Sequence, residues 1–267
     1  SFPTRRSSDL KFSYDFLCQY KATDKEVAYL ESSQEEADTK LLLQAIDATT
    51  SGATSIDIIS PDTDVFELAL RKFPVLCQNT FYVTGRGQRH RKILLSPIVQ
   101  ALGPARTAAL PWFHAWSGPD ITGSFACKGK LGCWKAFIEA DEESVTALAN
   151  LGTIVQPTSS TVAAIEKLAC QLYQPETHIS RVKDMIWFLF WKKQAQSEKL
   201  PPTQAALKEA TLRAHYRTMI WNNDKVLNPE LPSPETYGWT MDKGMFYIRI
   251  SLTWIKDCLT YLHNSWK

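Results

Sequence analysis

The chain has 267 residues, of which 44% are hydrophobic and 22% are charged, as in an ordinary globular protein. Its formal net charge of +2 excludes a strongly basic overall composition, so any basic surface for nucleic acid must be local. The longest apolar run covers residues 185–191, far short of the ~20 residues that a membrane-spanning helix needs. The cysteines form no C-x-x-C pair, and we expect reduced thiols in an intracellular protein.

Residues 1–10 (SFPTRRSSDL) resemble the translation of a short-read sequencing adapter. They contain neither a periodic apolar pattern nor the apolar stretch of a signal peptide. We therefore expect them to be non-native and without structure, and we expect the native protein to contain a further part upstream.

Alternating strand and helix patterns follow along the first half of the chain. The sequence predicts strands at 26–30, 55–60 and 79–83, separated by helices at 34–49 and 62–73. Asp62 is the expected N-cap of the second helix. This order predicts an α/β domain over residues 11–153, with a parallel sheet flanked by helices.

Strand signals fade after residue 95, and we expect a mostly helical C-terminal region at 154–267 with one more strand near 246–252. The aromatic stripe of Trp187, Phe188, Phe190 and Trp191 is expected to be helix core. Helices are predicted at 96–102, 105–116, 132–139, 142–150, 160–173, 180–197 and 203–222.

Two acidic clusters lie near the predicted strand ends. Glu35, Glu36 and Asp38 open one helix, and Asp62 and Asp64 follow a strand. Ligands bind α/β sheets at the carboxyl ends of parallel strands, where paired carboxylates can hold Mg²⁺ or Mn²⁺. Each cluster also has a structural explanation, because helix first turns favour capping and solvated acids without any metal.

A glycine- and lysine-containing turn follows Asp120 between two predicted helices. Glycines allow close backbone approach to a phosphate, and lysines supply charge, although an ordinary surface turn is the alternative. The residues concerned are Gly123, Lys128, Gly129 and Lys130.

A basic run lies between residues 85 and 92 and is expected to be a loop. Its cations are either phosphate contacts or solvated side chains. They are Arg86, Arg89, Arg91 and Lys92.

As a set, these motifs resemble the flap-endonuclease group of PIN-like nucleases: E-A-D on a helix, D-x-D after a strand, then G-x-D before a Gly/Lys turn. The resemblance implies a PIN-like parallel sheet and two Mg²⁺ or Mn²⁺ ions. It implies that Asp38, Asp62, Asp64 and Asp120 hold metal, and that Glu36 and Asp38 hold metal or orient water. It also implies that Gly123, Gly129 and Lys130 belong to a turn that grips DNA.

The motifs resemble more closely a group of uncharacterised animal proteins from transposon-rich genomes, over about residues 26–240. They share EEADTK, SPDTDV and PSPETYGW with this chain. Two departures stand out. Pro119 replaces a usual cysteine, and residues 11–30 lack the family's first aspartates, so we expect those ligands upstream.

The resemblance implies metal-dependent hydrolysis of a DNA or RNA phosphodiester in the nucleus, without a small-molecule cofactor or a membrane partner. Because ligands are expected upstream, we expect this chain to cleave poorly or not at all. One alternative is a scaffold or nucleic-acid-binding protein that keeps the fold without turnover. A phosphatase or phosphotransferase of another α/β fold is a third hypothesis.

Overall fold

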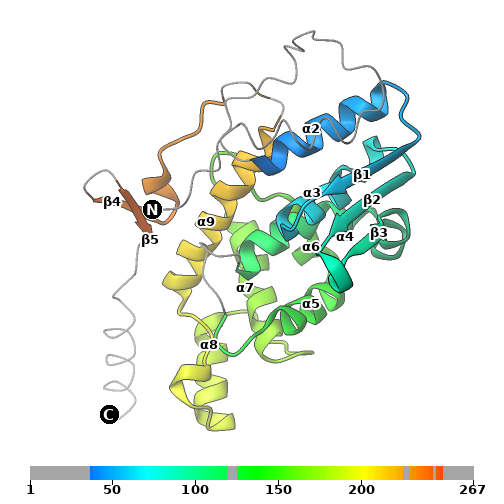
Figure 1. The fold of residues 1–267 in the computed structure, drawn as a ribbon. Helices are drawn as coiled ribbons and strands as arrows, with labels where there is room; N and C mark the ends of the chain where they lie inside the picture. Colours follow the sequence, from blue (N-terminus) through cyan, green and yellow to red (C-terminus); the bar gives the residue numbers. More distant parts are fainter. Residues whose placement is uncertain (1–36, 119–124, 225, 227–228, 243–244, 249–267) are drawn as a thin grey trace, which may run out of the picture. The chain divides into compact units, whose positions relative to one another are not determined.

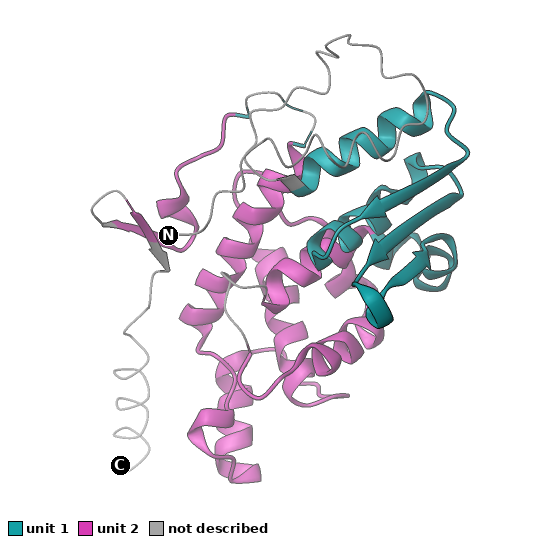
Figure 2. Cartoon of the chain, in the orientation of Figure 1, with its two compact units in different colours: residues 1–107, 224–229 teal, residues 108–223, 230–267 magenta. Residues whose placement is uncertain are grey.

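The computed structural model describes residues 37–118, 125–224, 226, 229–242 and 245–248. The expected strand at 26–30 and the adapter-like residues 1–10 lie outside this part of the chain. The described residues divide into two compact units (Figure 2). Unit 1 comes from residues 1–107 and 224–229, and unit 2 comes from residues 108–223 and 230–267. The boundary predicted near residue 153 lies within unit 2.

Unit 1 contains a small mixed sheet with the strand order β1-β2-β3 (Figure 1). β1 (Ser55–Ile59) and β2 (Asn79–Thr84) are parallel, with Ser55 opposite Asn79. β3 (Arg91–Leu94) pairs with β2 in the antiparallel direction. The chain is therefore a mixed α/β protein, and the basic run expected to be a loop forms part of an edge strand.

Two helices of unit 1 match the sequence pattern. α2 (Ala37–Thr50) packs against α3 (Thr63–Lys72), and each buries one apolar stripe. α3 begins at the predicted cap, because the Asp62 side chain accepts a hydrogen bond from the backbone N–H of Asp64. The helices predicted at 34–49 and 62–73 are thus confirmed where the structure describes them.

α4 (Ser96–Ser117) contains a sharp kink that divides it into two helical parts. Gly103 lies at the kink with φ 73° and ψ 166°, a conformation that other residues rarely adopt. Pro104 follows and disfavours a helical conformation at the preceding residue. The two separate helices predicted at 96–102 and 105–116 correspond to these two parts.

Unit 2 is mainly helical, as predicted. Several helices begin at a side-chain cap, including α7, where Thr158 accepts from the N–H of Thr161. Its helices are α5 (Lys130–Glu139), α6 (Glu142–Ala149), α7 (Ser159–Tyr173), α8 (Val182–Trp187) and α9 (Gln204–Asn222). A separate hairpin is formed by β4 (Trp239–Asp242) and β5 (Met245–Ile248). The strand expected near 246–252 is β5 in part, and β4 was not predicted.

Stacked aromatic rings fill the core of unit 2. The rings of Trp112 and Trp221 stack with centroids 6.0 Å apart, and both side chains are buried. Phe113 and Phe137 stack at 4.5 Å. Offset stacking of this kind adds to the free energy gained from burial, so α4, α5 and α9 contribute to one core.

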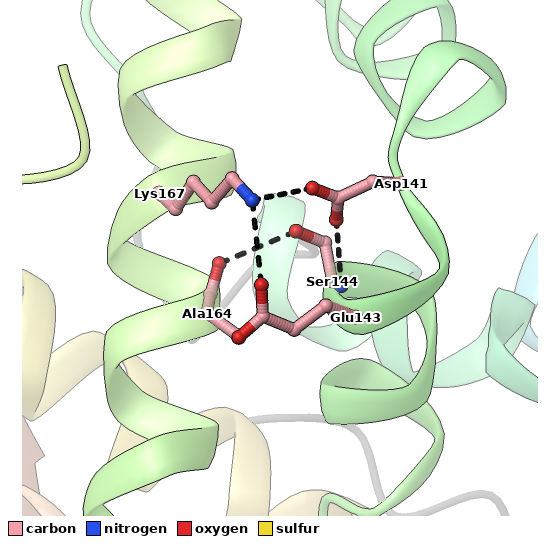
Figure 3. Close-up of polar contacts among 5 residues, drawn as sticks. All are labelled: Asp141, Glu143, Ser144, Ala164 and Lys167. Atoms are coloured by element: carbon pink, nitrogen blue, oxygen red, sulfur yellow. Dashed lines mark hydrogen bonds and ion pairs between the residues drawn. The ribbon is translucent and has the colours of Figure 1, made fainter. Parts of the chain in front are cut away.

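Lys167 on α7 links that helix to the start of α6 (Figure 3). Its Nζ atom lies 2.5 Å from Asp141 Oδ2 and 3.3 Å from Glu143 Oε2. Asp141 also caps α6 by accepting from the N–H of Ser144 at 2.9 Å. Burial acts to raise the pKa of Asp141, but the Lys167 and Ser144 hydrogen bonds outweigh it and lower that pKa. This acidic and basic cluster is thus explained by its role in joining two helices.

The prediction that the aromatic stripe at 187–191 forms helix core is wrong. Trp187, Phe190 and Trp191 are 41%, 41% and 50% exposed. Leu189 is the buried member of this stretch. In the part of the chain described here, no helix is long and apolar enough to span a bilayer.

Candidate functional site

The Asp62–Asp64 motif lies just after β1, where the chain turns into α3. Ser60 continues the sheet by donating its N–H to the carbonyl of Val83 at 3.1 Å. Its hydroxyl accepts the N–H of Asp62 at 3.0 Å, and Asp62 Oδ1 accepts the N–H of Asp64 at 3.0 Å. Asp62 is exposed, whereas Asp64 is 7% exposed. Local hydrogen bonds therefore fix both aspartates at the carboxyl end of a parallel strand.

Tyr82 on β2 connects this turn with α2. Its hydroxyl donates to the backbone carbonyl of Asp62 at 2.7 Å. Burial raises the pKa of Tyr82, a hydrogen bond with Thr84 lowers it, and the negative charges of Asp62 and Asp38 raise it further. Asp38 and Asp62 therefore lie close enough to act on the same hydroxyl, although 23 other residues separate them in sequence.

Tyr82 was not among the residues predicted from the sequence. It lies opposite Ile58 of β1 in the parallel register. Tyr82 is therefore next to the strand that leads to Asp62. The signal available in the sequence was a tyrosine between Phe81 and Val83 in a predicted strand, since a buried tyrosine hydroxyl usually finds a hydrogen-bond partner.

The carboxylates of Asp38, Asp62 and Asp64 suit a hard cation by donor type, because Mg²⁺ and Mn²⁺ prefer oxygen ligands. Among the described residues, however, no group of three or more His, Cys, Asp or Glu side chains is placed to hold a metal ion. Glu36 and Asp120, the other predicted acids, lie outside the described residues. The described carboxylates are thus of the right chemical type for Mg²⁺ or Mn²⁺. They are too few on their own to form a site for two metal ions.

The basic run 85–92 is exposed along its length. Arg86 precedes a single 3-10 turn at Gly87–Arg89, and Arg91 begins β3. Lys92 Nζ lies 2.7 Å from Asp57 Oδ2 and 4.4 Å from the centroid of the Phe81 ring. Lys92 therefore has partners within the sheet, and the three arginines present the exposed positive charge.

The Gly/Lys turn is described from Phe125 onward, and Gly123 lies outside the described residues. Gly129 is the N-cap residue of α5, and Lys130 is its exposed first residue. Lys128 Nζ lies 5.0 Å from the centroid of the Tyr173 ring, whose hydroxyl donates to the carbonyl of Ala126 at 3.2 Å. The described half of this turn is thus held against α7 by Tyr173.

Comparison with protein-family models found no match, and neither did comparison with curated proteins or with solved structures. The resemblance of the motifs to PIN-like nucleases therefore stays a prediction.

Proposed function

We propose that the chain belongs functionally with metal-dependent nucleases, in which Asp38, Asp62 and Asp64 take part in binding a divalent cation beside a nucleic-acid phosphate. The observation that carries the proposal is the meeting of α2, β1 and β2 at Tyr82. The Tyr82 hydroxyl donates to the carbonyl of Asp62, and the charges of Asp62 and Asp38 both raise its pKa. This meeting point follows the carboxyl end of β1, which is where α/β sheets bind ligands.

Each residue has a distinct part in this proposal. The exposed Asp62 would meet the cation first, the buried Asp64 would fix its position, and Asp38 would add charge from α2. A bound Mg²⁺ or Mn²⁺ supplies Lewis acidity to the scissile phosphate and lowers the pKa of a bound water. Arg86, Arg89 and Arg91 would contact flanking phosphates, since these contacts position a strand without reading its sequence. Glu36 and Asp120 would complete the set of acids.

The experiment is a cleavage assay of the full chain on labelled single-stranded and branched oligonucleotides with Mg²⁺ or Mn²⁺. We expect weak, metal-dependent cleavage that Asp62→Asn and Asp64→Asn each abolish. The matched control is Asp57→Asn, which removes a carboxylate from β1 that pairs with Lys92. Cleavage that persists at the wild-type rate in both Asp62→Asn and Asp64→Asn would rule out a ligand role for these aspartates.

A nucleic-acid-binding scaffold without turnover is the second candidate function. It is favoured by the capping role of Asp62, whose Oδ1 is engaged by the Asp64 N–H. A solvated acid cluster that caps a helix needs no metal. Oligonucleotide binding by the wild-type chain, with no cleavage in any metal, would support the scaffold over the nuclease.

A further inference from the structure

Three aromatic rings are exposed at the end of α8 and on the wider helical turn at Phe188–Lys192 that follows it. They belong to Trp187, Phe190 and Trp191, and the ring centroids of Phe190 and Trp191 lie 6.0 Å apart. Wide turns of this type are rare and occur frequently at functional sites. We refer to residues 187–193 as the aromatic–lysine segment.

The three rings are not needed to fix α8 on unit 2. Val182 and Met185 are fully buried and Leu189 is 9% exposed, so these residues form the stripe that faces the core. α8 packs against α7. Large exposed aromatics that lie close together mark a binding surface more often than scattered single ones do.

Positive charge surrounds the rings. Lys192 Nζ lies 5.9 Å from the centroid of the Trp187 ring, and Lys193 Nζ lies 5.8 Å from that of Phe188. Arg181 and Lys183 precede the segment, and Asp184 is the acid among them. An anionic partner with flat apolar groups fits this surface, because two of its cations lie within about 6 Å of ring centroids.

We propose that the aromatic–lysine segment binds single-stranded nucleic acid, with bases stacked on Trp187 and Trp191 and phosphates beside Lys192 and Lys193. Single strands are the occupant that the chemistry favours, since unpaired bases expose π faces at the spacing of backbone charges. The exposed apolar residues of this segment are all aromatic, as on base-stacking surfaces. Lysines beside Trp and Phe also occur on helices that lie on lipid surfaces, so membrane binding is one outcome of the test below. The segment belongs to unit 2 and the carboxylates belong to unit 1, and only its biological use rests on the proposed nuclease function.

The test is fluorescence anisotropy with the full chain, EDTA and a fluorescein-labelled oligothymidylate of about 20 nucleotides, longer than typical single-strand footprints of ~4–16. Trp187→Leu and Trp191→Leu keep an apolar side chain but lose the ring. We expect each to raise Kd about tenfold, which corresponds to ~1.4 kcal/mol. The matched control is Trp134→Leu, which removes a 37% exposed tryptophan from α5 and should leave Kd unchanged.

The lysines have a separate readout. Replacing Lys192 and Lys193 by Gln should reduce the slope of log K against log salt by about 1.4, since each phosphate contact on a single strand contributes ~0.7. Circular dichroism would establish that every variant is folded.

Wild-type affinity in both tryptophan variants would overturn the proposal. So would variants that lose binding to phosphatidylserine vesicles but keep oligonucleotide binding, because the segment would then be a membrane contact. EDTA prevents metal-dependent cleavage, so this assay measures binding alone. Absence of binding by the segment therefore leaves the nuclease proposal standing. Likewise, absence of cleavage by the wild-type chain leaves this binding result intact.

Discussion

The Nδ1 atom of His215 accepts a hydrogen bond of 3.1 Å from the backbone N–H of Gly152, which lies 63 residues earlier in the chain. On the other side of the ring, Nε2 lies 2.8 Å from the carbonyl oxygen of Ile154. Because an amide N–H only donates, Nδ1 carries no proton and Nε2–H is the donor to Ile154. A neutral, fully buried imidazole therefore holds the 152–154 loop onto α9.

Protonation of His215 should destabilise the fold. Burial lowers the pKa of His215 below its ordinary value of 6.5, although hydrogen bonds to the carbonyls of Ile154 and Val155 raise it. The unfolded chain then binds more protons than the folded one, so the free energy of unfolding falls as pH drops below about 6.5. Urea denaturation between about pH 5 and 8 measures this slope.

The variant His215→Gln should lose that part of the slope and about 1–3 kcal/mol of stability, since it strains a buried hydrogen-bond pair. The matched control is His178→Gln, because His178 is exposed in the same unit. A slope in His215→Gln equal to that of the wild type would show that another group is responsible.

A methyl group at Gly152 should destabilise unit 2. Gly152 has φ 72°, and a Cβ there would contact the Thr218 side chain and lie 2.6 Å from the backbone N of Met219. Gly152→Ala thus combines a backbone cost of about 1–2 kcal/mol with an overpacking cost of about 1–3 kcal/mol. Chemical denaturation gives the sum.

Gly103→Ala measures a backbone cost without overpacking. Gly103 has φ 73° and ψ 166°, a conformation almost restricted to glycine, and a Cβ there would meet nothing within 4 Å. Its variant should lose about 1–3 kcal/mol. Wild-type stability in Gly103→Ala would show that the backbone at the kink relaxes at no cost.

Asp62 should cap α3 through its side-chain oxygen, and its negative charge should not be needed for this. Asp62→Ala removes the acceptor for the Asp64 N–H and should cost about 1 kcal/mol. Asp62→Asn keeps an oxygen acceptor and should stay within a few tenths of a kcal/mol of the wild type, because Asn is as good a cap as Asp. Thermal denaturation compares the two variants, and equal melting temperatures for both would exclude the capping contribution.

The ion pair of Lys72 with Asp224 should contribute more than that of Lys92 with Asp57. Asp224 is 3% exposed and its Oδ2 lies 2.5 Å from Lys72 Nζ, so Lys72→Met leaves a buried carboxylate without its nearest cation. We expect a loss of about 2–3 kcal/mol, somewhat below the full cost of a broken buried pair because Arg71 also acts on Asp224. Lys92→Met breaks a half-exposed pair and should cost about 1 kcal/mol or less. Similar losses in urea denaturation would contradict this difference.

The elements predicted best are those whose local chemistry and packing agree. α3 has its cap at Asp62 and its apolar stripe on one face, and the structure has both. β1 alternates apolar and polar residues, and Ile56 and Ile58 are buried as the pattern predicts. The Gly103–Pro104 pair marked the kink in α4, because both residues oppose a continuous helix.

The predictions that failed needed information from distant parts of the chain. β3 is an edge strand that begins with Arg91 and Lys92, and its identity depends on pairing with β2 rather than on its own residues. Residues 185–191 are apolar on every side, so periodicity cannot say which side is buried. Similarly, the approach of Asp38 to Tyr82 depends on how α2 packs on the sheet, which no local pattern encodes.

The pair of Lys72 and Asp224 has a consequence for synthesis of the chain. Unit 1 is interrupted by residues 108–223 of unit 2, since Asp224 follows α9 while Lys72 ends α3. A ribosome that has finished the sheet of unit 1 must still make every helix from α5 to α9 before Lys72 meets its partner. During this interval Lys72 lacks its partner, because Asp224 has not yet been synthesised. A chaperone that binds then would contact the sheet of unit 1 before residues 224–229 are made.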